Sequence, residues 1–278
     1  MIFSSINIDG QLLSLKEPEI MGILNLTPDS FHDGARYNTE AAALKQAEKM
    51  LTEGAKIIDV GGMSSRPGAA LVEEKEEQRR ILSTISAIRS EFPTAIVSVD
   101  TVFASTARSA ADAGAQIIND ISAGTIDAEL FKTVADLGLP YILMHMLGTP
   151  KTMQFDPKYE NLVSDIIRFL HTKIIELRQL GIKDIIIDPG FGFGKKLDHN
   201  YRLLNQLSEF SVLGCPLLVG LSRKSMIYKL LGRQSNSSLN ATTAAHMVAL
   251  QNGAKLLRVH DVQAAMDCIK IFQQLNKK

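Results

Sequence analysis

The stretch Ile185-Ile186-Ile187-Asp188-Pro189-Gly190-Phe191-Gly192-Phe193-Gly194-Lys195 decides the fold of this chain. Its three consecutive isoleucines predict a strand that is buried on both faces. The strand ends at Asp188, because Pro189 lacks the backbone N–H that a further ladder bond needs. A carboxylate at the end of a buried strand, beside a glycine loop that lets a ligand approach the backbone, indicates a functional site.

Glycines followed by a lysine first suggest that this loop cradles a phosphate. The spacing of the glycines fits neither GxxxxGK[ST] nor GxGxxG, so the motif itself gives little support to that hypothesis. A tight turn with an exposed acid is the simpler alternative on turn chemistry alone.

A unit of short apolar strand, polar strand end, loop and amphipathic helix recurs from Glu19 onward. We expect strands at residues 20–24, 56–58, 95–99, 116–118, 141–144, 185–187, 216–220 and 255–259. We expect the first helix to start near residues 39–40, the second near residue 73, and the last to cover 262–275. Strands that alternate with helices predict right-handed βαβ units and a parallel sheet. Eight such units without a linker favour a closed (β/α)8 TIM barrel over an open doubly wound sheet.

The first 19 residues predict a short β-hairpin outside this repeat. Residues 5–8 alternate in polarity, Asp9-Gly10 is a hairpin turn signal, and residues 12–15 form the returning segment. We therefore divide the chain into an N-terminal β-hairpin extension at 1–19 and a single barrel domain at 20–278, and we expect the hairpin to cap one end of the barrel.

Composition limits the function classes. Of the 278 residues, 45% are hydrophobic and the formal net charge is zero, which argues against a surface that coats nucleic acid. The chain has no tryptophan and 6% aromatic residues, so an aromatic platform for stacking bases is not expected either. Cys215 and Cys268 form no CxxC pair, no long apolar run is present, and no basic leader precedes an apolar segment. We expect a cytoplasmic protein with two buried thiols.

Polar residues follow the predicted strands, and the carboxyl ends of barrel strands all open onto one face. The residues expected to converge there are Asn25, Asp59, Asp100, Asn119, His145, Asp188, Lys224, Arg258 and His260. Amides and carboxylates follow strands one to four and six, whereas cations follow strands seven and eight. This division suits a ligand with a hydrogen-bonding heterocycle at one end and an anion at the other. A single polar residue at a strand end is usually a loop cap, but the number and chemistry of these residues together favour a site.

Two connections at this face are long for βα loops, at residues 26–34 and 61–69. Both mix glycine, proline, hydroxyl groups and a charge. They could be mobile surface loops, but we favour a pair of lids that close over a substrate and exclude water.

With these residues assembled, the chain resembles the dihydropteroate synthase family over nearly its full length. The motifs that carry the resemblance are MGILNLTPDSF at 21–31, DVGG at 59–62, SRPG at 65–68, SVDT at 98–101, IND at 118–120, MHM at 144–146, DPGFGFGK at 188–195, SRKS at 222–225 and RVHD at 258–261. The resemblance implies a homodimeric transferase that joins para-aminobenzoate to 6-hydroxymethyl-7,8-dihydropterin diphosphate with Mg2+, and that sulfonamides target. The products are 7,8-dihydropteroate and pyrophosphate.

The resemblance also implies a role for each matching residue. Asp100, Asn119, Asp188 and Lys224 would bind the pterin; Asn25, Arg258 and His260 the diphosphate, with Asn25 also at the Mg2+; Phe31, Ser65, Arg66, Pro67, Phe193 and Ser225 the aminobenzoate. The family is thought to react by a dissociative route, in which diphosphate leaves before the arylamine attacks. Asp100, Arg258 and His260 would then act by stabilising charge, without a covalent enzyme intermediate.

The second long loop departs from the family pattern. It reads Met63-Ser64-Ser65-Arg66-Pro67-Gly68 where the family usually has Glu-Ser-Thr-Arg-Pro-Gly. Ser65 keeps a hydroxyl and loses a methyl group, and Met63 removes a carboxylate. Both lie in the aminobenzoate loop, so sensitivity to sulfonamide inhibitors is the property that we expect them to affect.

Two other functions share part of this pattern. A pterin methyltransferase of the methyltetrahydrofolate type would share Asp100, Asn119 and Asp188, but it should lack the motifs at 27–31 and 222–225. A non-catalytic paralogue would bind pterin without turnover. The presence of every matched anion, pterin and lid residue argues against it.

Overall fold

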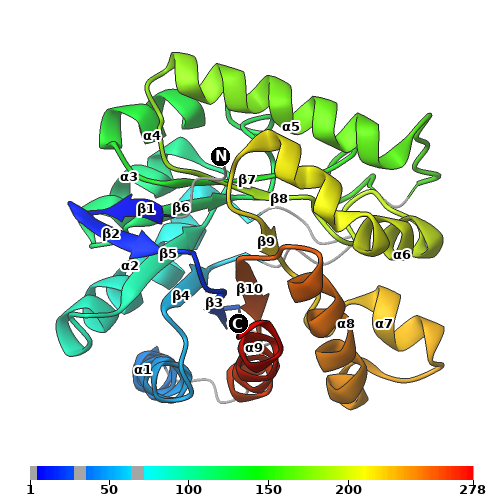
Figure 1. Cartoon of the computed structure of the whole chain (residues 1–278). Coiled ribbons are helices and arrows are strands. Elements are labelled where there is room, and N and C mark those ends of the chain that lie inside the picture. The colour runs from blue at the N-terminus through cyan, green and yellow to red at the C-terminus, as the bar shows by residue number, and fades with distance from the viewer. Residues whose placement is uncertain (1–4, 28–35, 64–71, 154, 278) are drawn as a thin grey trace.

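Eight parallel strands form the centre of the molecule (Figure 1). In this computed structural model, residues 5–27, 36–63, 72–153 and 155–277 are described. The strands are β3 Glu19–Asn25, β4 Ile57–Gly61, β5 Ile96–Asp100, β6 Ile117–Asp120, β7 Tyr141–Met144, β8 Ile185–Asp188, β9 Leu218–Val219 and β10 Leu256–Val259. Their order is β8-β7-β6-β5-β4-β3-β10-β9. A parallel bridge between Ile187 and Leu217 joins the two edges of the sheet, and the predicted (β/α)8 barrel is confirmed.

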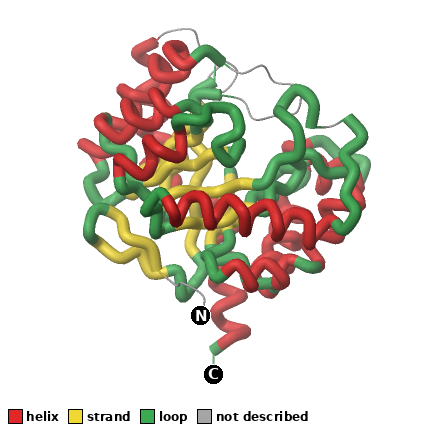
Figure 2. Tube along the Cα trace, turned by 90° about the horizontal axis from the view of Figure 1, so that it is seen from above, coloured by secondary structure: helices red, strands yellow, loops and turns green. Residues whose placement is uncertain are grey.

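Helices surround the strands, as the view from above shows (Figure 2). They are α1 Arg36–Thr52, α2 Glu74–Glu91, α3 Ala104–Asp112, α4 Leu130–Leu137, α5 Leu162–Gln179, α6 Leu197–Asn205, α7 Ser225–Leu230, α8 Leu239–Gln251 and α9 Val262–Asn276, with 3-10 turns η2 Leu207–Leu213 and η3 Ser235–Ser237. None of the helices within the described ranges is long and apolar enough to cross a membrane. Both cysteines are buried and unpaired, as predicted.

Three boundaries differ from the sequence-based expectation. Strand β4 continues through Asp59 to Gly61, because every residue from Ile57 on pairs with both neighbouring strands. Strand β9 is only two residues long, Leu218–Val219; Pro216, where the expected strand starts, has no backbone N–H for a ladder bond, and Leu217 forms only an isolated bridge. Helix α1 begins at Arg36, about one turn before the expected start.

The predicted hairpin is present as a separate antiparallel sheet, with β1 Ser5–Ile8 paired to β2 Gln11–Ser14. Its turn residues Asp9 and Gly10 both have positive φ, of 50° and 82°, as a tight hairpin turn requires. The hairpin buries Ile6, Ile8, Leu13 and Leu15 against the first residues of the barrel strands. It therefore covers the amino-terminal end of the barrel and leaves the opposite end for a site.

The interior of the barrel is arranged in layers, because alternate residues of a strand point to opposite faces. The layer beside the hairpin is apolar and contains Met21, Ile57, Ile96, Ile117, Ile142, Ile186, Leu218 and Leu256, one residue from each strand. The residues between them point outward and pack against the helices. Two residues further along β4, β5, β6, β8 and β10 the inward residues are polar, whereas β3 and β7 keep the apolar Ile23 and Met144.

Candidate active site

The polar layer lies at the carboxyl-terminal end of the barrel, which we call the mouth. Counting two residues on from the apolar layer reaches Asp59 on β4, Asn119 on β6, Asp188 on β8 and Arg258 on β10. Asp100 lies two residues beyond Ser98 on β5 and faces inward for the same reason. Strand parity therefore brings together most of the polar residues that the sequence placed at strand ends.

Asp59 is at the centre of a hydrogen-bonded network and is fully buried, with 0% of its surface exposed. Its Oδ2 accepts from Arg258 Nε at 2.6 Å and from Asn119 Nδ2 at 3.0 Å. Arg258 Nη2 donates to Asp100 Oδ2 at 2.7 Å. We call Asp59, Asp100, Asn119 and Arg258 the Asp59 network. Sequence reasoning places Asp59 at the mouth but assigns it no specific role, and its position at the centre of the network follows only from the packed fold.

Burial controls the charge states of this network. Burial raises the pKa of Asp100 to about 7; Arg258 opposes the rise, and Asp59 adds to it. Burial alone would lower the pKa of Arg258, but Asp59 and Asp100 hold it above its ordinary value. Arg258 is therefore a fixed cation, and Asp100 is a carboxylate that exchanges its proton near neutral pH.

The opposite side of the mouth contains Asp188 and Lys224. Asp188 Oδ1 accepts a hydrogen bond from Gly190 N at 2.7 Å. Lys224 Nζ donates to the carbonyl oxygen of Phe191 and lies 4.8 Å from the centre of the Phe193 ring. Burial raises the pKa of Asp188 and lowers that of Lys224 to about 8, and each side chain opposes the shift of the other. The carboxylate and the ammonium thus form a complementary pair beside the glycine loop.

Asn25 lies where three neighbouring strands end. It is in register with Gly61, which is in register with Asp100. A Cβ atom built on Gly61 would lie 3.5 Å from Asn25 Oδ1 and 3.4 Å from Asp100 Cβ. Both are ordinary van der Waals distances, so the Asn25 amide oxygen and the Asp100 side chain flank Gly61 at the mouth.

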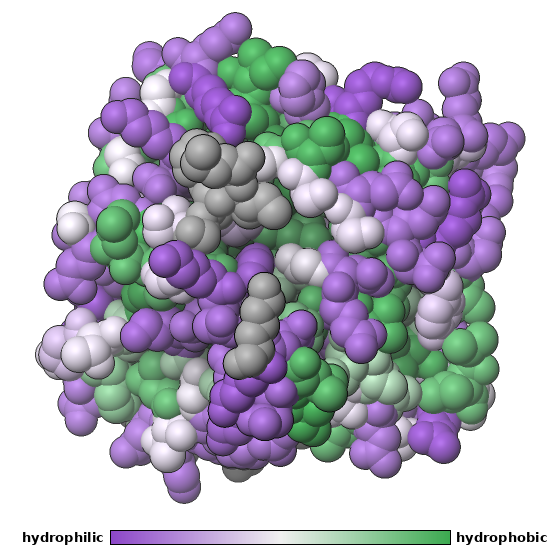
Figure 3. Space-filling view, in the orientation of Figure 1, coloured by the Kyte–Doolittle hydropathy of each residue, from purple (hydrophilic) through white to green (hydrophobic). Residues whose placement is uncertain are grey.

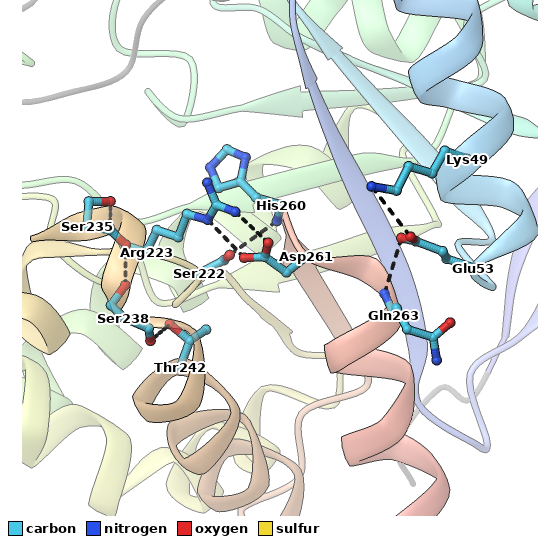
Figure 4. Close-up of polar contacts among 10 residues, drawn as sticks. All are labelled: Lys49, Glu53, Ser222, Arg223, Ser235, Ser238, Thr242, His260, Asp261 and Gln263. Atoms are coloured by element: carbon cyan, nitrogen blue, oxygen red, sulfur yellow. Dashed lines mark hydrogen bonds and ion pairs between the residues drawn. The ribbon is translucent and has the colours of Figure 1, made fainter.

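His260 follows β10, and its backbone N–H donates to Ser222 Oγ at 3.2 Å. Next to it, Asp261 forms two hydrogen bonds with Arg223, at 2.9 and 2.5 Å (Figure 4). Arg223 has a φ of 55°, an uncommon backbone conformation for a residue with a side chain. The Arg223–Asp261 pair joins the loop after β9 to the loop after β10, and these loops contain Lys224 and His260 respectively.

His145 was expected at the mouth, and this prediction is wrong. Ile142 and Met144 of β7 face inward, so His145 faces outward, where its ring packs edge-on against Phe169 at 5.0 Å. Its Nδ1 lies 2.9 Å from Lys195 Nζ. Asp120 faces outward in the same way on β6 and accepts hydrogen bonds from Tyr141 Oη, Ser122 N and Gly124 N.

The glycine loop was first interpreted as a phosphate cradle on account of its lysine. Lys195 is instead buried, and it donates to Gly190 O at 2.8 Å and Phe193 O at 3.0 Å. No signal in the sequence distinguishes this internal role from anion binding, because glycines and a lysine suit both.

The residues predicted to bind aminobenzoate are only partly described. Phe31, Ser65, Arg66 and Pro67 lie outside the described residues. Phe193 is buried in a small apolar cluster with Val102, Met144 and Met146, and Met63 packs against this cluster. Ser225 is the first residue of α7 and follows Lys224 directly. Within the described ranges, no three His, Cys, Asp or Glu residues are grouped so as to hold a metal ion.

The geometry agrees with the relatives of the chain. Residues 21–260 match the family described as pterin binding enzyme. The dihydropteroate synthase of Haemophilus influenzae is 46% identical over 267 residues, which cover 95% of this chain and 96% of that protein. The crystal structure of the Yersinia pestis dihydropteroate synthase with a sulfonamide drug complex has a TM-score of 0.92 at 42% identity and covers 98% of both chains. Xanthomonas albilineans dihydropteroate synthase with 4-aminobenzoic acid gives a TM-score of 0.92 at 40% identity over 99% of both chains. This chain therefore belongs to the pterin-binding enzyme family, as one of its dihydropteroate synthases.

Proposed function

We propose that the chain joins para-aminobenzoate to 6-hydroxymethyl-7,8-dihydropterin diphosphate, giving 7,8-dihydropteroate and pyrophosphate. The observation that carries this proposal is the mouth itself, where the Asp59 network faces the Asp188–Lys224 pair. On one side Arg258 offers a fixed positive charge for an anion. On the other side Asp188 offers an acceptor and Lys224 a donor for a heterocycle. The near full-length similarity to dihydropteroate synthases supports the same reaction.

The pterin ring presents an amino group and a ring N–H as donors, and a carbonyl oxygen and ring nitrogens as acceptors. Asp188 would accept from the donor edge, and its buried position makes this bond strong. Lys224 would donate to the carbonyl oxygen, and Asn119 can both donate and accept. Asp100 would complete the pterin site from β5.

The chemistry needs charge stabilisation rather than a nucleophile on the protein. As the C–O bond to the diphosphate breaks, positive charge develops on the pterin methylene carbon, close to the Asp100 carboxylate. Arg258, His260 and Asn25 would stabilise the leaving diphosphate. The arylamine nitrogen then forms the C–N bond and releases one proton.

Magnesium is compatible with this arrangement. Asn25 would contribute a hard oxygen ligand, since its Oδ1 lies beside Gly61 and near Asp100. Because the described residues contain no cluster of three acidic, His or Cys side chains, the ion would take most of its ligands from water and diphosphate oxygens. Bound there, Mg2+ would neutralise charge on the leaving diphosphate.

The second substrate would lie against Phe193 and Ser225. Ser225 N–H and hydroxyl are at the start of α7, where a carboxylate is favourably placed. Phe31, Ser65, Arg66 and Pro67 would complete this pocket from the two long loops. Met63, packed on the Phe193 cluster, fixes the start of the second loop by apolar contact where the family usually has a carboxylate.

A homodimer and a cytoplasmic location complete the proposal. Large apolar side chains are exposed on the last three α-helices and at the end of α7, and they would suit a second copy of the chain: Leu230, Leu231, Leu239, Val248 and Ile271. Figure 3 shows apolar patches among polar surface on one face of the molecule. The two unpaired cysteines agree with a reducing compartment. Light scattering on the purified protein would test the dimer by its mass.

The reaction is tested by incubating the purified protein with the pterin diphosphate, para-aminobenzoate and Mg2+ and measuring pyrophosphate release. We expect release that depends on all three components. Pterin binding without release would favour a non-catalytic paralogue. Absence of both binding and release would contradict the synthase assignment, whereas methyl transfer from a methylated pterin would favour the methyltransferase.

A further inference from the structure

Lys195 is a buried cation that the proposed reaction does not use. Only 3% of its surface is exposed, and no carboxylate within the described ranges forms an ion pair with it. Its three ammonium hydrogens face three acceptors: His145 Nδ1 at 2.9 Å, Gly190 O at 2.8 Å and Phe193 O at 3.0 Å. Every donor of the ammonium group therefore has a partner.

These contacts join two segments that already touch closely. His145 N donates to Asp188 O at 3.0 Å, so the segment after β7 pairs with the end of β8. A Cβ atom on Gly190 would overlap the carbonyl oxygen of His145, and one on Gly194 would lie 2.6 Å from Leu147 O. The glycine loop is therefore in close contact with residues 145–147. Lys195 joins the two segments, because its Nζ contacts His145 on one and the carbonyl groups of Gly190 and Phe193 on the other.

The buried ammonium is costly for the fold. Removing a charge from water costs several kcal/mol, and a hydrocarbon of similar volume often gives equal or greater stability. Burial lowers the pKa of Lys195 well below its ordinary value, and the same is true of His145. With Lys195 Nζ donating, the His145 ring accepts at Nδ1 and carries its proton on Nε2. Stability alone does not explain a lysine at this position.

The loop that Lys195 fixes contains groups that face the mouth. The Phe191 carbonyl oxygen accepts from Lys224, and the Phe193 ring lies under the same ammonium group. Asp188, by contrast, ends β8 and is held by the ladder bonds of that strand, although Gly190 N at the start of the loop also donates to it. Movement of the loop would therefore displace Phe193 more than it displaces Asp188.

We propose that Lys195 is a positioning residue, which holds the 189–195 loop against His145 so that Phe193 forms one wall of the second substrate's site. This role rests on the proposed function, since Phe193 matters only if an aromatic amine binds beside it. Lys195 touches neither substrate, and its effect passes through the two loop carbonyl groups and His145.

The test compares Lys195→Met, which keeps side-chain length and removes the donors, with Lys196→Met as the control. Lys196 is the next residue, 47% of its side chain is exposed, and it pairs with Asp156 at 2.7 Å. For Lys195→Met we expect the aminobenzoate KM to rise on the order of tenfold, with the pterin diphosphate KM changed less than about twofold. Lys196→Met should match the wild type in both constants.

A second measurement does not depend on turnover. The ¹⁵N chemical shift of His145 Nδ1 should change in Lys195→Met and stay constant in Lys196→Met, because only the first variant removes the donor. His145→Phe keeps the aromatic packing, removes the acceptor and should raise the aminobenzoate KM in the same direction. If wild type and Lys196→Met release no pyrophosphate, the proposed function fails while the contact is still measured. Equal rises in both KM values with a lower Tm, or unchanged KM values, would overturn the positioning role.

Discussion

Asp59 is the residue on which the Arg258 side of the mouth depends. Replacing Asp59 with asparagine would leave Arg258 with one carboxylate partner in a buried site. It would also replace the carboxylate that accepts from Asn119 Nδ2 with a neutral amide, which has one acceptor oxygen instead of two. We expect Asp59→Asn to lower kcat/KM by about 100-fold, which corresponds to the roughly 3 kcal/mol typical of a disrupted buried charge pair. Asp112→Asn, an exposed change on α3, is the control for the loss of one carboxylate. Steady-state kinetics with each substrate varied in turn would measure the effect, and a change below about threefold would contradict it.

Asp188 is predicted to recognise the donor edge of the pterin. Asp188→Ala would leave ligand donors without a partner in a buried pocket, which costs about 1–3 kcal/mol or more for a charged acceptor. We expect calorimetry to detect no pterin binding to this variant at concentrations that saturate the wild type. Unchanged pterin affinity would rule out the assigned role.

Asp100 connects activity to pH. Its pKa is raised to about 7, so the carboxylate is ionised above that pH and protonated below it. Protonation would remove the negative charge near the developing cation, and we therefore expect kcat to fall as the pH decreases through about 7. The diphosphate substrate also titrates, so Asp100→Asn is the necessary comparison: its residual activity should lack this acidic limb. A limb of the same midpoint in both proteins would assign it to the substrate.

At the scale of the elements, α2 contributes a buried acid to the back of the mouth. Glu77 Oε2 accepts from Thr101 Oγ1 at 2.7 Å, and burial raises the pKa of Glu77 to about 7. A carboxyl group whose pKa is raised by folding stabilises the protein fully below its unfolded value of 4.5, and this stabilisation is lost as the pH rises to about 7. Glu77→Gln should therefore gain stability relative to the wild type over this range, by up to about 3 kcal/mol. Urea unfolding at pH 5 and pH 8 would measure it, and a difference that is the same at both pH values would contradict the prediction.

The order and type of the elements could be predicted because each strand contains a short apolar run and polar residues follow most of these runs. The register within the mouth could not be predicted from strand ends alone. His145 follows β7 as Asp188 ends β8, yet one residue of offset turns its side chain to the opposite face. The Lys195 contacts were beyond sequence reasoning for another reason: they depend on how closely residues 145–147 approach the glycine loop, which only the packed fold determines.

At the scale of the whole molecule, the two ends of the barrel have separate tasks. The hairpin and the apolar layer stabilise one end, and the polar layer at the other end contains the candidate active site. A TIM barrel commonly separates stability from activity in this way, because loops at the mouth can vary while the opposite end stays packed. Damage to the hairpin should therefore reduce stability without changing substrate binding.

Leu15 gives the sharpest test of this separation, since it is fully buried between the hairpin and the barrel interior. Leu15→Ala removes three heavy atoms from a closed apolar layer, which costs about 2–5 kcal/mol through lost transfer energy and a residual cavity. In a chain of this size the expected decrease in Tm is on the order of 5–10 °C. Leu12→Ala is the matched control in the same hairpin, because the Leu12 side chain is 74% exposed and its loss should change Tm by less than about 2 °C. Both variants should keep wild-type KM values for both substrates when assayed well below Tm. A raised KM in Leu15→Ala alone would show that the hairpin end and the mouth are coupled through the barrel interior.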